Sequence, residues 1–569
     1  MKILGLKLTH DGGLALIDDG RLIFSYEMEK INNSPRLEKF NLSVQQVDDM
    51  LKRYGYTLET LDEIVVDGWT NIDLYRKNEL DKTTIKNIQL STNLYTDITL
   101  AKYGMLISRN DNILAAHTGR LDVINLSYSS YMHVTGHFFS AYCTSPYAES
   151  LQDSFVLIWD GGMPPQLFHY QAKCRHVTNI GSLFLFPGHI YTGFAHEFSP
   201  FDDTEIHHYS VAGKLMAYVA LGTVNDDLMS LFNTIYGDLI EQLGDEVYTK
   251  SIEWVAQGFV IKAKAVCISS GLSNEDILCT FHFFLQNLIV KNLRNMIANS
   301  GFEQTNICIA GGCGLSIKWN SAIRDSAIFK NVWVPPFPND SGSAVGTACS
   351  AMVVKTNRHH LDWTVYSGPS IVNNGKDNDE YFEDRCTIQE LAKILYEKRE
   401  PVVLLNGEAE LGPRALGNRS LISVANCDKM KAILNKVKGR EDYRPVAPIC
   451  LESDAPLLFN PGNPDPYMLF EHQVRDEWKD KIPAVVHIDG SARLQTISKE
   501  DNLTVFELLT SYKLLSGLSV LCNTSANFNG RGFFPDVASA MEWGELNYIW
   551  CDNTLYTKKN PMTFLSRDE

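Results

Sequence analysis

Paired cysteines at the spacing of metal-binding or redox motifs are missing from this chain. None of its 12 cysteines forms a Cys-x-x-Cys pair, which is the usual arrangement in structural zinc sites and thioredoxin-like sites. Several cysteines, including Cys308 and Cys522, lie within apolar, strand-like runs. We therefore expect reduced, buried cysteines that pack as small apolar side chains.

Positive charge is also scarce. The chain has 51 Lys and Arg against 68 Asp and Glu, which gives a formal net charge of −17 at pH 7. A broad nucleic-acid-binding face needs clustered Lys and Arg to displace counterions. We therefore expect no nucleic-acid partner, although this charge balance is compatible with a local basic pocket.

Long apolar runs are absent as well. No stretch reaches the roughly 18 uninterrupted apolar residues that a membrane-spanning helix needs. The most apolar segment, Cys279–Val290, is interrupted by polar residues such as His282 and is predicted to be a buried helix. The start of the chain places Lys7 within a strand pattern and lacks the apolar core and cleavage site of a signal peptide. We expect a cytoplasmic protein with no membrane partner.

The composition is otherwise that of an ordinary soluble globular protein. Hydrophobic residues make up 44% of the 569 residues, and charged residues make up 21%. The length alone predicts two or three domains. Each of them is long enough to bury a sizeable core.

Short apolar runs separated by Asp-Gly turns open two parts of the chain. At the N-terminus they predict three strands joined by tight turns, at Ile3–Leu8, Leu14–Ile17 and Arg21–Glu27. A related pattern returns near residue 155, where an apolar strand precedes two further predicted strands, at Gln166–Ala172 and Ile180–Phe186. We interpret this as a weak internal duplication, in which two lobes face each other across a nucleotide-binding cleft.

A histidine pair is the most informative local feature. His133 and His137 are four residues apart, about one helical turn, so both imidazoles would leave the same face of a helix. Two neutral imidazoles can share one divalent metal if oxygen ligands come from elsewhere. Asp160 and Asp340 lie in Gly-rich turns and offer those oxygens. The four residues predict a metal site, against the alternative of ordinary buried or surface histidines.

A glycine pair follows another predicted strand. The segment Asn306–Ser316 contains a strand, then Gly311 and Gly312, and then a helix start. Glycines allow a close backbone approach to a flat ring or a phosphate, which would suit a nucleotide. The same pattern fits an ordinary turn, so the residues alone leave both interpretations open.

The composition changes between Val354 and Arg385, where turn-forming and acidic residues are frequent. This stretch predicts a loop or linker with little core. We place the linker at residues 355–387, after a first region at 1–354 and before a second region at 388–569.

Basic side chains gather in the second region despite the acidic total. They lie beside turns rich in Gly, Pro and Asn, and Ser525 adds a hydroxyl after an apolar strand. Arg binds phosphate oxygens as a planar fork and Lys binds them as a point charge, so the set can hold a compact dianion beside a triphosphate. Surface salt bridges are the competing interpretation. The basic residues are Arg414, Arg419, Lys436, Lys438, Arg440, Arg444 and Arg493.

Four segments of the second region carry a family resemblance. They are Gly412–Ser420, Asn435–Pro448, Asp489–Thr496 and Asn523–Ser525. With them, nearly the whole chain resembles the nodulation-protein-U and cephem-carbamoyltransferase family of ATP-dependent O-carbamoyltransferases. The opening His10-Asp11-Gly12, together with Glu27, Glu29 and Lys30, looks most like the cephem hydroxymethyl carbamoyltransferase branch.

The resemblance implies an α/β protein with two active sites. The first region would be a duplicated actin/sugar-kinase-like domain, close to the tRNA threonylcarbamoyl transferase subunit. The second would resemble the enzyme that makes threonylcarbamoyl adenylate. In the family, carbamoyl phosphate and ATP give carbamoyl adenylate in the C-terminal domain, and an alcohol attacks that adenylate in the N-terminal domain. The expected acceptor is a natural-product or antibiotic-like small molecule.

The resemblance also implies roles for single residues. The family's metal ligands match the four residues named above, and the expected metal is Fe(II). The candidate base near the acceptor is His10, and the nucleotide contacts in the first region are Lys214, Gly311 and Gly312. The residues Lys438 and Arg444 are assigned to catalysis as well as binding. The full carbamoyl-phosphate pocket matches Arg414, Lys438, Arg444, Arg493 and Ser525.

Three other functions stay open at this point. A tRNA-modifying threonylcarbamoyl transferase is disfavoured by the acidic balance and the lack of a basic arm. A maturation enzyme for the cyanide ligands of hydrogenases would carry Cys-x-x-Cys zinc fingers, which the sequence lacks. A nucleotide-binding scaffold without transfer chemistry would release no pyrophosphate and AMP in response to carbamoyl phosphate.

Overall fold

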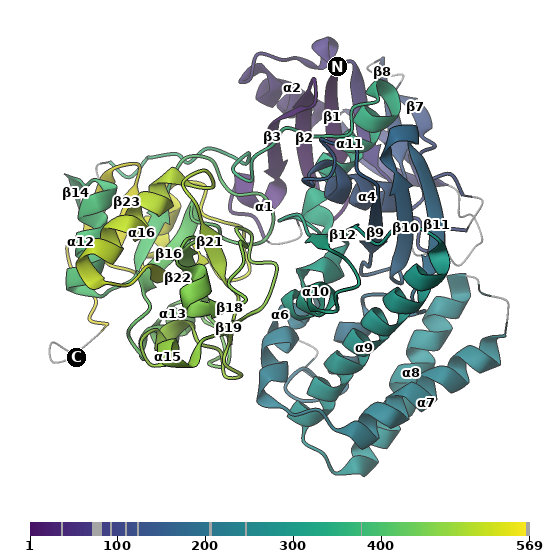
Figure 1. The fold of residues 1–569 in the computed structure, drawn as a ribbon. Helices are drawn as coiled ribbons and strands as arrows, with labels where there is room; N and C mark the ends of the chain where they lie inside the picture. Colours follow the sequence, from purple (N-terminus) through teal and green to yellow (C-terminus); the bar gives the residue numbers. More distant parts are fainter. Residues whose placement is uncertain are drawn as a thin grey trace.

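The computed structural model places the chain in two α/β regions that lie side by side (Figure 1). It describes residues 1–35, 38–70, 82–91, 94–108, 111–121, 125–203, 208–244, 247, 249–376 and 378–564. In this part of the chain, no helix combines the length and the apolar character needed to cross a bilayer. The predicted buried helix at Cys279–Val290 lies within α9 (Asn274–Ser300). The cysteines are free and mostly buried, as expected, although Cys174 is exposed.

The first sheet opens with the three antiparallel strands that the sequence predicts. β1 pairs with β2 and β2 with β3 in antiparallel orientation, whereas β1, β4 and β8 run parallel. The sheet has the order β3-β2-β1-β4-β8-β7. Because parallel strands end at the same edge of a sheet, Lys7, Asp67 and the residues after β8 come together. The strands are β1 (Lys2–Lys7), β2 (Gly13–Asp18), β3 (Arg21–Glu27), β4 (Glu63–Asp67), β7 (His117–Leu121) and β8 (Leu126–Tyr131).

The second sheet repeats this arrangement, in agreement with the predicted duplication. Its order is β11-β10-β9-β12-β13, with β9, β10 and β11 antiparallel and β9, β12 and β13 parallel. The expected strand at Ile180–Phe186 is wrong in its bounds. The strand β11 is a largely polar, half-buried strand without an apolar pattern, whereas Leu183–Phe186 form a buried loop. The strands are β9 (Ser154–Ile158), β10 (Gln166–Gln171), β11 (His176–Ser182), β12 (Asn306–Ala310) and β13 (Asn331–Trp333).

Two helices pack against each other between these sheets. α4 (His133–Cys143) lies on β9 and β12, and α11 (Ser343–Thr356) lies on β1, β2 and β4. Glycine allows the close contact, since a Cβ on Gly346 would lie 2.1 Å from the carbonyl oxygen of Gly136. α4 begins with the predicted histidine pair, and α11 follows Asp340 after one short turn. α4 and the short turn before α11 therefore bring three of the four predicted metal ligands to one place.

A helical layer covers the other face of the second sheet (Figure 1). Along β9, Phe155 and Leu157 pack into this layer, whereas Val156 and Ile158 face α4. The strand is buried on both faces, which explains why it is apolar from Phe155 to Ile158. The helices are α5 (Ile190–Ala195), α6 (His208–Tyr218), α7 (Asp226–Leu243), α8 (Thr249–Ser270), α9 and α10 (Ile317–Asp325).

Smaller elements complete the first region. The strands β5 (Lys82–Ser91) and β6 (Leu94–Ala101) form a separate two-stranded sheet. The short helices are α1 (Met28–Ile31), α2 (Val44–Lys52), η1 (Leu58–Thr60), η3 (Ala172–Cys174), η4 (Val219–Leu221), η5 (Gly312–Leu315) and η6 (Asp340–Gly342).

The second region is built on an eight-stranded mixed sheet, in the order β14-β24-β23-β15-β16-β22-β17-β21. A three-stranded sheet, β18-β19-β20, lies beside it. The large sheet contains β14 (Tyr381–Arg385), β15 (Val402–Leu405), β16 (Arg419–Val424), β17 (Ala447–Leu451), β21 (Gln495–Ile497), β22 (Val520–Ser525), β23 (Tyr548–Cys551) and β24 (Thr554–Lys558). The small sheet contains β18 (Phe459–Asn460), β19 (His472–Val474) and β20 (Ser491–Ala492).

Helices pack around this sheet, and the longest two, α12 and α16, contact each other. Its core holds the apolar side chains of both helices and of the central strands. The helices are α12 (Ile388–Lys398), α13 (Met430–Val437), α14 (Ala455–Leu458), α15 (Asp476–Lys479), η7 (Pro483–Val485), α16 (Leu503–Ser516) and α17 (Val537–Trp543).

The connection between the two regions is more tightly packed than the sequence suggests. Leu361 is buried in the core of the first region. The backbone N–H of Leu22 donates to the carbonyl oxygen of Asp362 at 2.8 Å, so the segment runs beside β3. Later backbone hydrogen bonds join the same segment to the loop before β16. The expectation of little core is therefore corrected, because this stretch ties β3 to the second region.

Candidate metal centre and anion pocket

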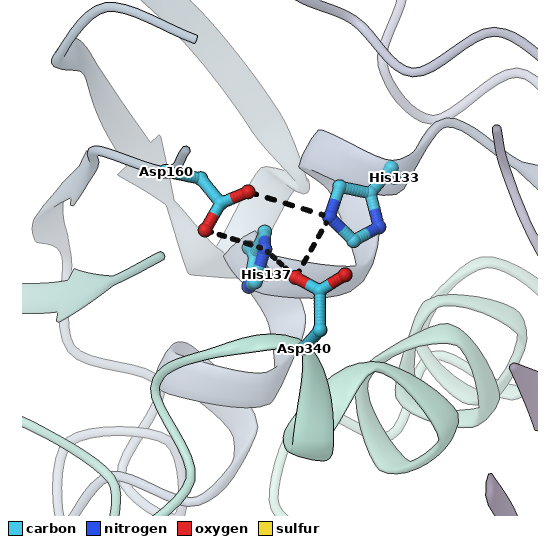
Figure 2. Close-up of side chains that lie close together, drawn as sticks. All are labelled: His133, His137, Asp160 and Asp340. Carbon is cyan, nitrogen blue, oxygen red and sulfur yellow. Dashed lines mark ion pairs between the residues drawn. The ribbon is translucent and has the colours of Figure 1, made fainter. Parts of the chain in front are cut away.

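Four buried side chains converge between the two sheets (Figure 2). His133 and His137 project from α4, Asp160 follows β9, and Asp340 begins η6. The Nε2 atoms of His133 and His137 lie 3.2 and 3.4 Å from Asp340 Oδ1, and 3.9 and 4.0 Å from the two oxygens of Asp160. One ligand atom from each residue lies within 4.8 Å of the other three. The structure thus brings together the four residues that the sequence singles out.

The donor atoms of this metal cluster fit a divalent metal. Within the described residues, the Nε2 atoms of His133 and His137 are buried without a hydrogen-bond partner. Imidazole and carboxylate ligands bind a metal at about 2.0–2.2 Å, which places the ligand atoms of one ion roughly 3–4 Å apart. Two imidazoles with two carboxylates suit first-row transition metals. A metal at this place stays a prediction, and the site has the chemistry to hold one.

Asp67 holds His133 in the orientation that a metal ligand requires. His133 Nδ1 lies 2.7 Å from Asp67 Oδ2, so Nδ1 carries the proton and Nε2 faces the cluster. Lys7 Nζ lies 3.0 Å from the same Asp67 oxygen and 2.9 Å from Asp340 Oδ2. Lys7 therefore bridges two carboxylates: that of Asp67, which orients His133, and that of Asp340, which belongs to the cluster.

Asp160 is fixed by two hydrogen bonds. The Tyr103 hydroxyl donates to its Oδ2, and the Gly312 N–H donates to its Oδ1 at 2.7 Å. Gly311 has a φ of +87°, and a Cβ there would lie 2.3 Å from the carbonyl oxygen of Trp159. The glycine pair thus lets the turn after β12 approach the turn after β9. Its predicted contact with a nucleotide stays a prediction.

The buried charges shift one another's pKa values. Burial raises the pKa of Asp340, but Lys7 and His133 hold it well below its usual range. Burial lowers the pKa of Lys7, yet Asp340 and Asp67 outweigh this and raise it overall. Burial also lowers the pKa of His133, but chiefly Asp67 raises it to about 9. Metal binding at Nε2 would therefore displace a proton from His133.

Three of these supporting residues are missing from the sequence-based prediction. Asp67 carries a usable signal, since it ends an apolar strand just as Asp160 does. Lys7 carries one too, because a lysine within an apolar strand needs a buried partner. Tyr103 carries none, since a tyrosine after a strand is common on any protein surface.

His10 lies at the accessible side of the metal cluster. Its Nδ1 is 2.8 Å from Asp11 Oδ2, and its Nε2 is 3.7 Å from Asp340 Oδ2. The ring packs edge-on against Trp69. The His10 side chain is 29% exposed, against 5% for Asp340, so an incoming molecule can reach it. The structure places the predicted base beside the cluster, and its role stays a prediction.

A separate pocket lies between the two regions, and its wall contains most of the predicted carbamoyl-phosphate residues. These are Arg414, Arg444, Arg493 and Ser525. Arg440, which belongs to the basic set found in the sequence but not to the pocket that the resemblance implies, also lines it and donates to Thr524 Oγ1 at 2.8 Å. The first region contributes Gly213, Met216, Ala217, Ile317 and Lys318.

This arginine pocket has an excess of positive charge. Burial lowers the pKa of Arg493, and the guanidinium groups of Arg414 and Arg444 lower it further, to well below its usual range. In the part of the chain that the structure describes, Arg493 Nε is buried without a hydrogen-bond partner. An anion with several oxygens would neutralise these cations and accept their hydrogen bonds.

Two predicted lysines take other positions. Lys438 does not line the pocket, since its buried Nζ donates to the carbonyl oxygens of Ser525 and Asn527 at 2.8 and 2.6 Å. Lys438 therefore fixes the backbone at the end of β22 and just after it. The resemblance implies instead a direct contact between Lys438 and carbamoyl phosphate. Lys214 forms an ion pair with Glu441 at 2.6 Å. It directly follows Gly213, which lines the pocket.

A four-residue segment, η5, connects the two sites. Its first N–H, from Gly312, donates to Asp160 in the metal cluster. Its last carbonyl, from Leu315, accepts a hydrogen bond from Arg414 Nη2 at 3.4 Å. A 3₁₀ segment of this length rises about 6–8 Å, so the metal cluster and the arginine pocket are near neighbours.

Lys30 and Glu27 hold the loop that carries Arg414. Lys30 Nζ donates to the carbonyl oxygens of Glu410 and Gly412 at 2.8 and 2.6 Å and pairs with Glu27 at 2.7 Å. The Gly412 N–H donates to Glu27 at 2.9 Å. Both charged side chains are buried, and the sequence gives them only as part of a resemblance.

Replacing Lys30 with methionine should destabilise the protein by about 3–5 kcal/mol, because Glu27 would stay buried without its partner. Urea unfolding of the full chain measures this. The matched control is Lys355→Met, which breaks an ion pair with Glu63 at an exposed lysine and should cost only about 0–1 kcal/mol. Equal losses in the two variants would contradict the structural role of Lys30.

Both regions of this chain are similar in sequence to known proteins. The family described as Carbamoyltransferase N-terminus matches residues 2–349, and the one described as Carbamoyltransferase C-terminus matches residues 392–558. The chain is 44% identical to nodulation protein U of Rhizobium tropici, over 98% of this chain and 96% of that protein.

Two relatives are named as cephem O-carbamoyltransferases. The chain is 30% identical to a 3'-hydroxymethylcephem-O-carbamoyltransferase of Streptomyces clavuligerus, over 98% of this chain and 99% of the enzyme. It is 31% identical to the enzyme of that name from Amycolatopsis lactamdurans, over 94% of each. Over the full chain, identity is therefore higher to the nodulation protein than to these two cephem enzymes, although the opening motif looks most like the cephem branch.

Proposed function

The chain belongs to the carbamoyltransferase family, and we propose that it is an ATP-dependent O-carbamoyltransferase with a small-molecule alcohol as acceptor. Two relatives carry O-carbamoyl transfer to a hydroxymethyl group in their names, which supports a hydroxyl of a natural-product or antibiotic-like molecule. The proposed donor is carbamoyl phosphate.

We assign one half-reaction to each region. Residues 1–354 form the proposed transfer domain, with an actin/sugar-kinase-like fold that the repeated sheet order supports. Residues 388–569 form the proposed adenylate-forming domain, similar to threonylcarbamoyl-adenylate synthase, and residues 355–387 connect the two. Fe(II) is the proposed metal at His133, His137, Asp160 and Asp340.

One observation carries the proposal: an arginine pocket and a His/Asp cluster lie at the two ends of η5. A labile mixed anhydride made in one site would have a short path to the other. Since such an anhydride reacts with water, a short enclosed path favours productive transfer. A scaffold that only binds a nucleotide has no need for two such sites.

The first half-reaction would take place in the arginine pocket. One water converts carbamoyl phosphate to carbamate and phosphate, and a carbamate oxygen then attacks the α-phosphorus of ATP. Carbamoyl adenylate forms and pyrophosphate leaves, so the atoms balance. Arg414, Arg444 and Arg493 would neutralise the anions that must approach one another. Lys438 would act indirectly, by fixing the Ser525 backbone.

The second half-reaction would take place at the metal cluster. The alcohol oxygen attacks the carbamoyl carbon, the carbon–oxygen bond to AMP breaks, and the alcohol proton passes to His10 Nε2. A bound divalent metal would supply Lewis-acid polarisation at this place. Asp67 and Tyr103 would keep His133 and Asp160 in position for it.

The direct test supplies the full chain with ATP, ¹³C-labelled carbamoyl phosphate and a mixture of small-molecule alcohols from a cell extract. We expect pyrophosphate, AMP and a product that gains one labelled carbamoyl group by mass spectrometry. Absence of pyrophosphate release that depends on carbamoyl phosphate would refute the enzyme and favour a nucleotide-binding scaffold.

Arg444→Ala should lower carbamoyl-phosphate-dependent pyrophosphate release by roughly 30- to 1000-fold, because a charged contact in a shielded pocket contributes about 2–4 kcal/mol. Lys436→Ala is the matched control, since Lys436 lies in the same basic run but is exposed. A pyrophosphate assay on both variants shows whether Arg444 takes part in the first half-reaction. An unchanged rate in Arg444→Ala would move the donor site elsewhere.

A further inference from the structure

Lys7 is a buried cation that the proposed reaction does not use. It ends β1, and its side chain is 1% exposed. Its ammonium lies 2.9 Å from Asp340 and 3.0 Å from Asp67, with the Trp69 ring centre 4.5 Å away. Burying a charge in this way is costly unless its partners compensate it. The partners here are a proposed metal ligand and the residue that orients another ligand.

The formal charges of the metal cluster, Asp67 and Lys7 cancel when a divalent ion is counted. Three carboxylates, those of Asp67, Asp160 and Asp340, contribute three negative charges. Lys7 contributes one positive charge, and imidazoles that bind a metal are neutral. A divalent ion brings this set to zero, whereas a trivalent ion leaves it at +1. The nearby His10 and Asp11 pair with each other.

We propose that Lys7 is a fixed counter-charge of the metal centre, which balances it for a divalent ion and disfavours a trivalent one. The inference rests on the proposed metal site. It goes beyond that site, because it assigns the selection of ion charge to a residue that is not a ligand.

The contacts of Asp340 show how Lys7 acts. Asp340 Oδ1 faces the Nε2 atoms of both histidines, and its Oδ2 faces Lys7. One carboxylate therefore separates the ammonium from the ion position, and the repulsion between them grows with the charge of the ion. At an effective dielectric constant of about 20, one unit of charge roughly 6 Å away changes affinity by about 100-fold. Lys7 should thus weaken the binding of a trivalent ion more than that of a divalent ion.

The test compares Zn²⁺ with Ga³⁺, two redox-inert ions of similar size, on the metal-stripped full chain. A chelator buffer sets the free ion concentration, and the readout is the ratio of the two affinities. Lys7→Met should raise the Ga³⁺ to Zn²⁺ affinity ratio by about 10- to 100-fold. Lys355→Met, which removes an exposed ammonium that pairs with Glu63 and not with the metal cluster, should leave the ratio unchanged.

A second pair of variants tests the charge argument by its sign. Asp67→Asn removes a negative charge while keeping an oxygen for the His133 Nδ1 proton, so the ratio should fall by a similar factor. The double variant Lys7→Met/Asp67→Asn has the net charge of the wild type, so its ratio should return toward the wild-type value. If Lys7→Met alone fails to fold, the shift in Asp67→Asn and its reversal in the double variant still decide.

The outcomes separate this inference from the proposed metal site. A wild-type chain that binds neither ion would refute the metal site itself. A wild-type chain that binds zinc, with the same affinity ratio in all variants, would overturn the role of Lys7 and leave the site intact. A shift of the same sign in Lys7→Met and Asp67→Asn would also overturn it, because it would reflect lost packing and not charge.

Discussion

Replacing both His133 and His137 with alanine is expected to remove the bound metal and to lower carbamoyl transfer by at least about 10⁴-fold. Two of the four proposed ligands are lost, and the remaining carboxylates of Asp160 and Asp340 cannot hold the ion alone. A metal that polarises a reacting carbonyl or phosphoryl oxygen contributes several kcal/mol, and each 1.36 kcal/mol is a factor of ten in rate.

Pyrophosphate release should persist in this double variant. The arginines that would bind the donor belong to the second region, and Arg414 contacts Leu315 at the end of η5 that lies away from the metal cluster. The variant should therefore make carbamoyl adenylate and release it to water. AMP would still appear, while the carbamoylated alcohol would not.

Three measurements on one preparation decide this prediction: metal content per chain, pyrophosphate release and labelled product. The matched control is His282→Ala, which removes another buried histidine of the first region that packs on Trp319 and lies outside the metal cluster. It should keep its metal. Full metal retention in the double variant would refute the ligand assignment, and loss of pyrophosphate release would tie the first step to the metal as well.

The fold could be predicted wherever the sequence pattern is local. β1, β2 and β3 alternate apolar runs with Asp-Gly turns, and their observed bounds agree with the predicted ones to within one residue. The strand β11 could not be placed, because it lies at the edge of its sheet and carries polar, half-buried side chains. The tight packing of the connection was not predicted either, because its few apolar residues, such as Leu361, Trp363 and Val365, stand among many polar and turn-forming residues.

The candidate site divides in the same way. His133 and His137 show helical spacing, and Asp160 lies in an Asp-Gly turn. A short stretch of sequence is therefore enough to predict each of these three residues as a candidate ligand. Lys7 and Asp67 lie 60 positions apart in the chain, and only the parallel pairing of β1 with β4 brings their side chains together. No local pattern in the sequence predicts that pairing.

Lys438 and Arg440, on either side of Gly439, show that residue spacing alone does not predict the direction in which a side chain points. α13 ends at Val437, and Lys438 then turns inward onto the backbone after β22. Gly439 has a φ of +55°, which reverses the chain, and Arg440 faces the pocket. The sequence identifies the basic run, but the direction of each side chain depends on this left-handed glycine.

His10→Asn is expected to lower carbamoylation of the alcohol by about 10²- to 10⁴-fold, the usual size of a general-base contribution. Asparagine is close to histidine in size and can keep a hydrogen bond to Asp11, but it cannot take a proton from the alcohol. His10 is the accessible residue of this group, with Nε2 on the side of Asp340. Loss of His10 should therefore lower the rate of acceptor carbamoylation while the metal content stays nearly unchanged.

The same variant should nearly preserve pyrophosphate release, because His10 lies at the metal cluster and does not line the arginine pocket. Without acceptor chemistry, the adenylate should leak and hydrolyse to AMP. Measuring pyrophosphate, AMP and product together separates these steps. His176→Asn, at an exposed histidine on β11, is the control and should behave as the wild type. If His10→Asn loses both half-reactions equally, His10 lies on the nucleotide path or supports the fold, and the base is another residue.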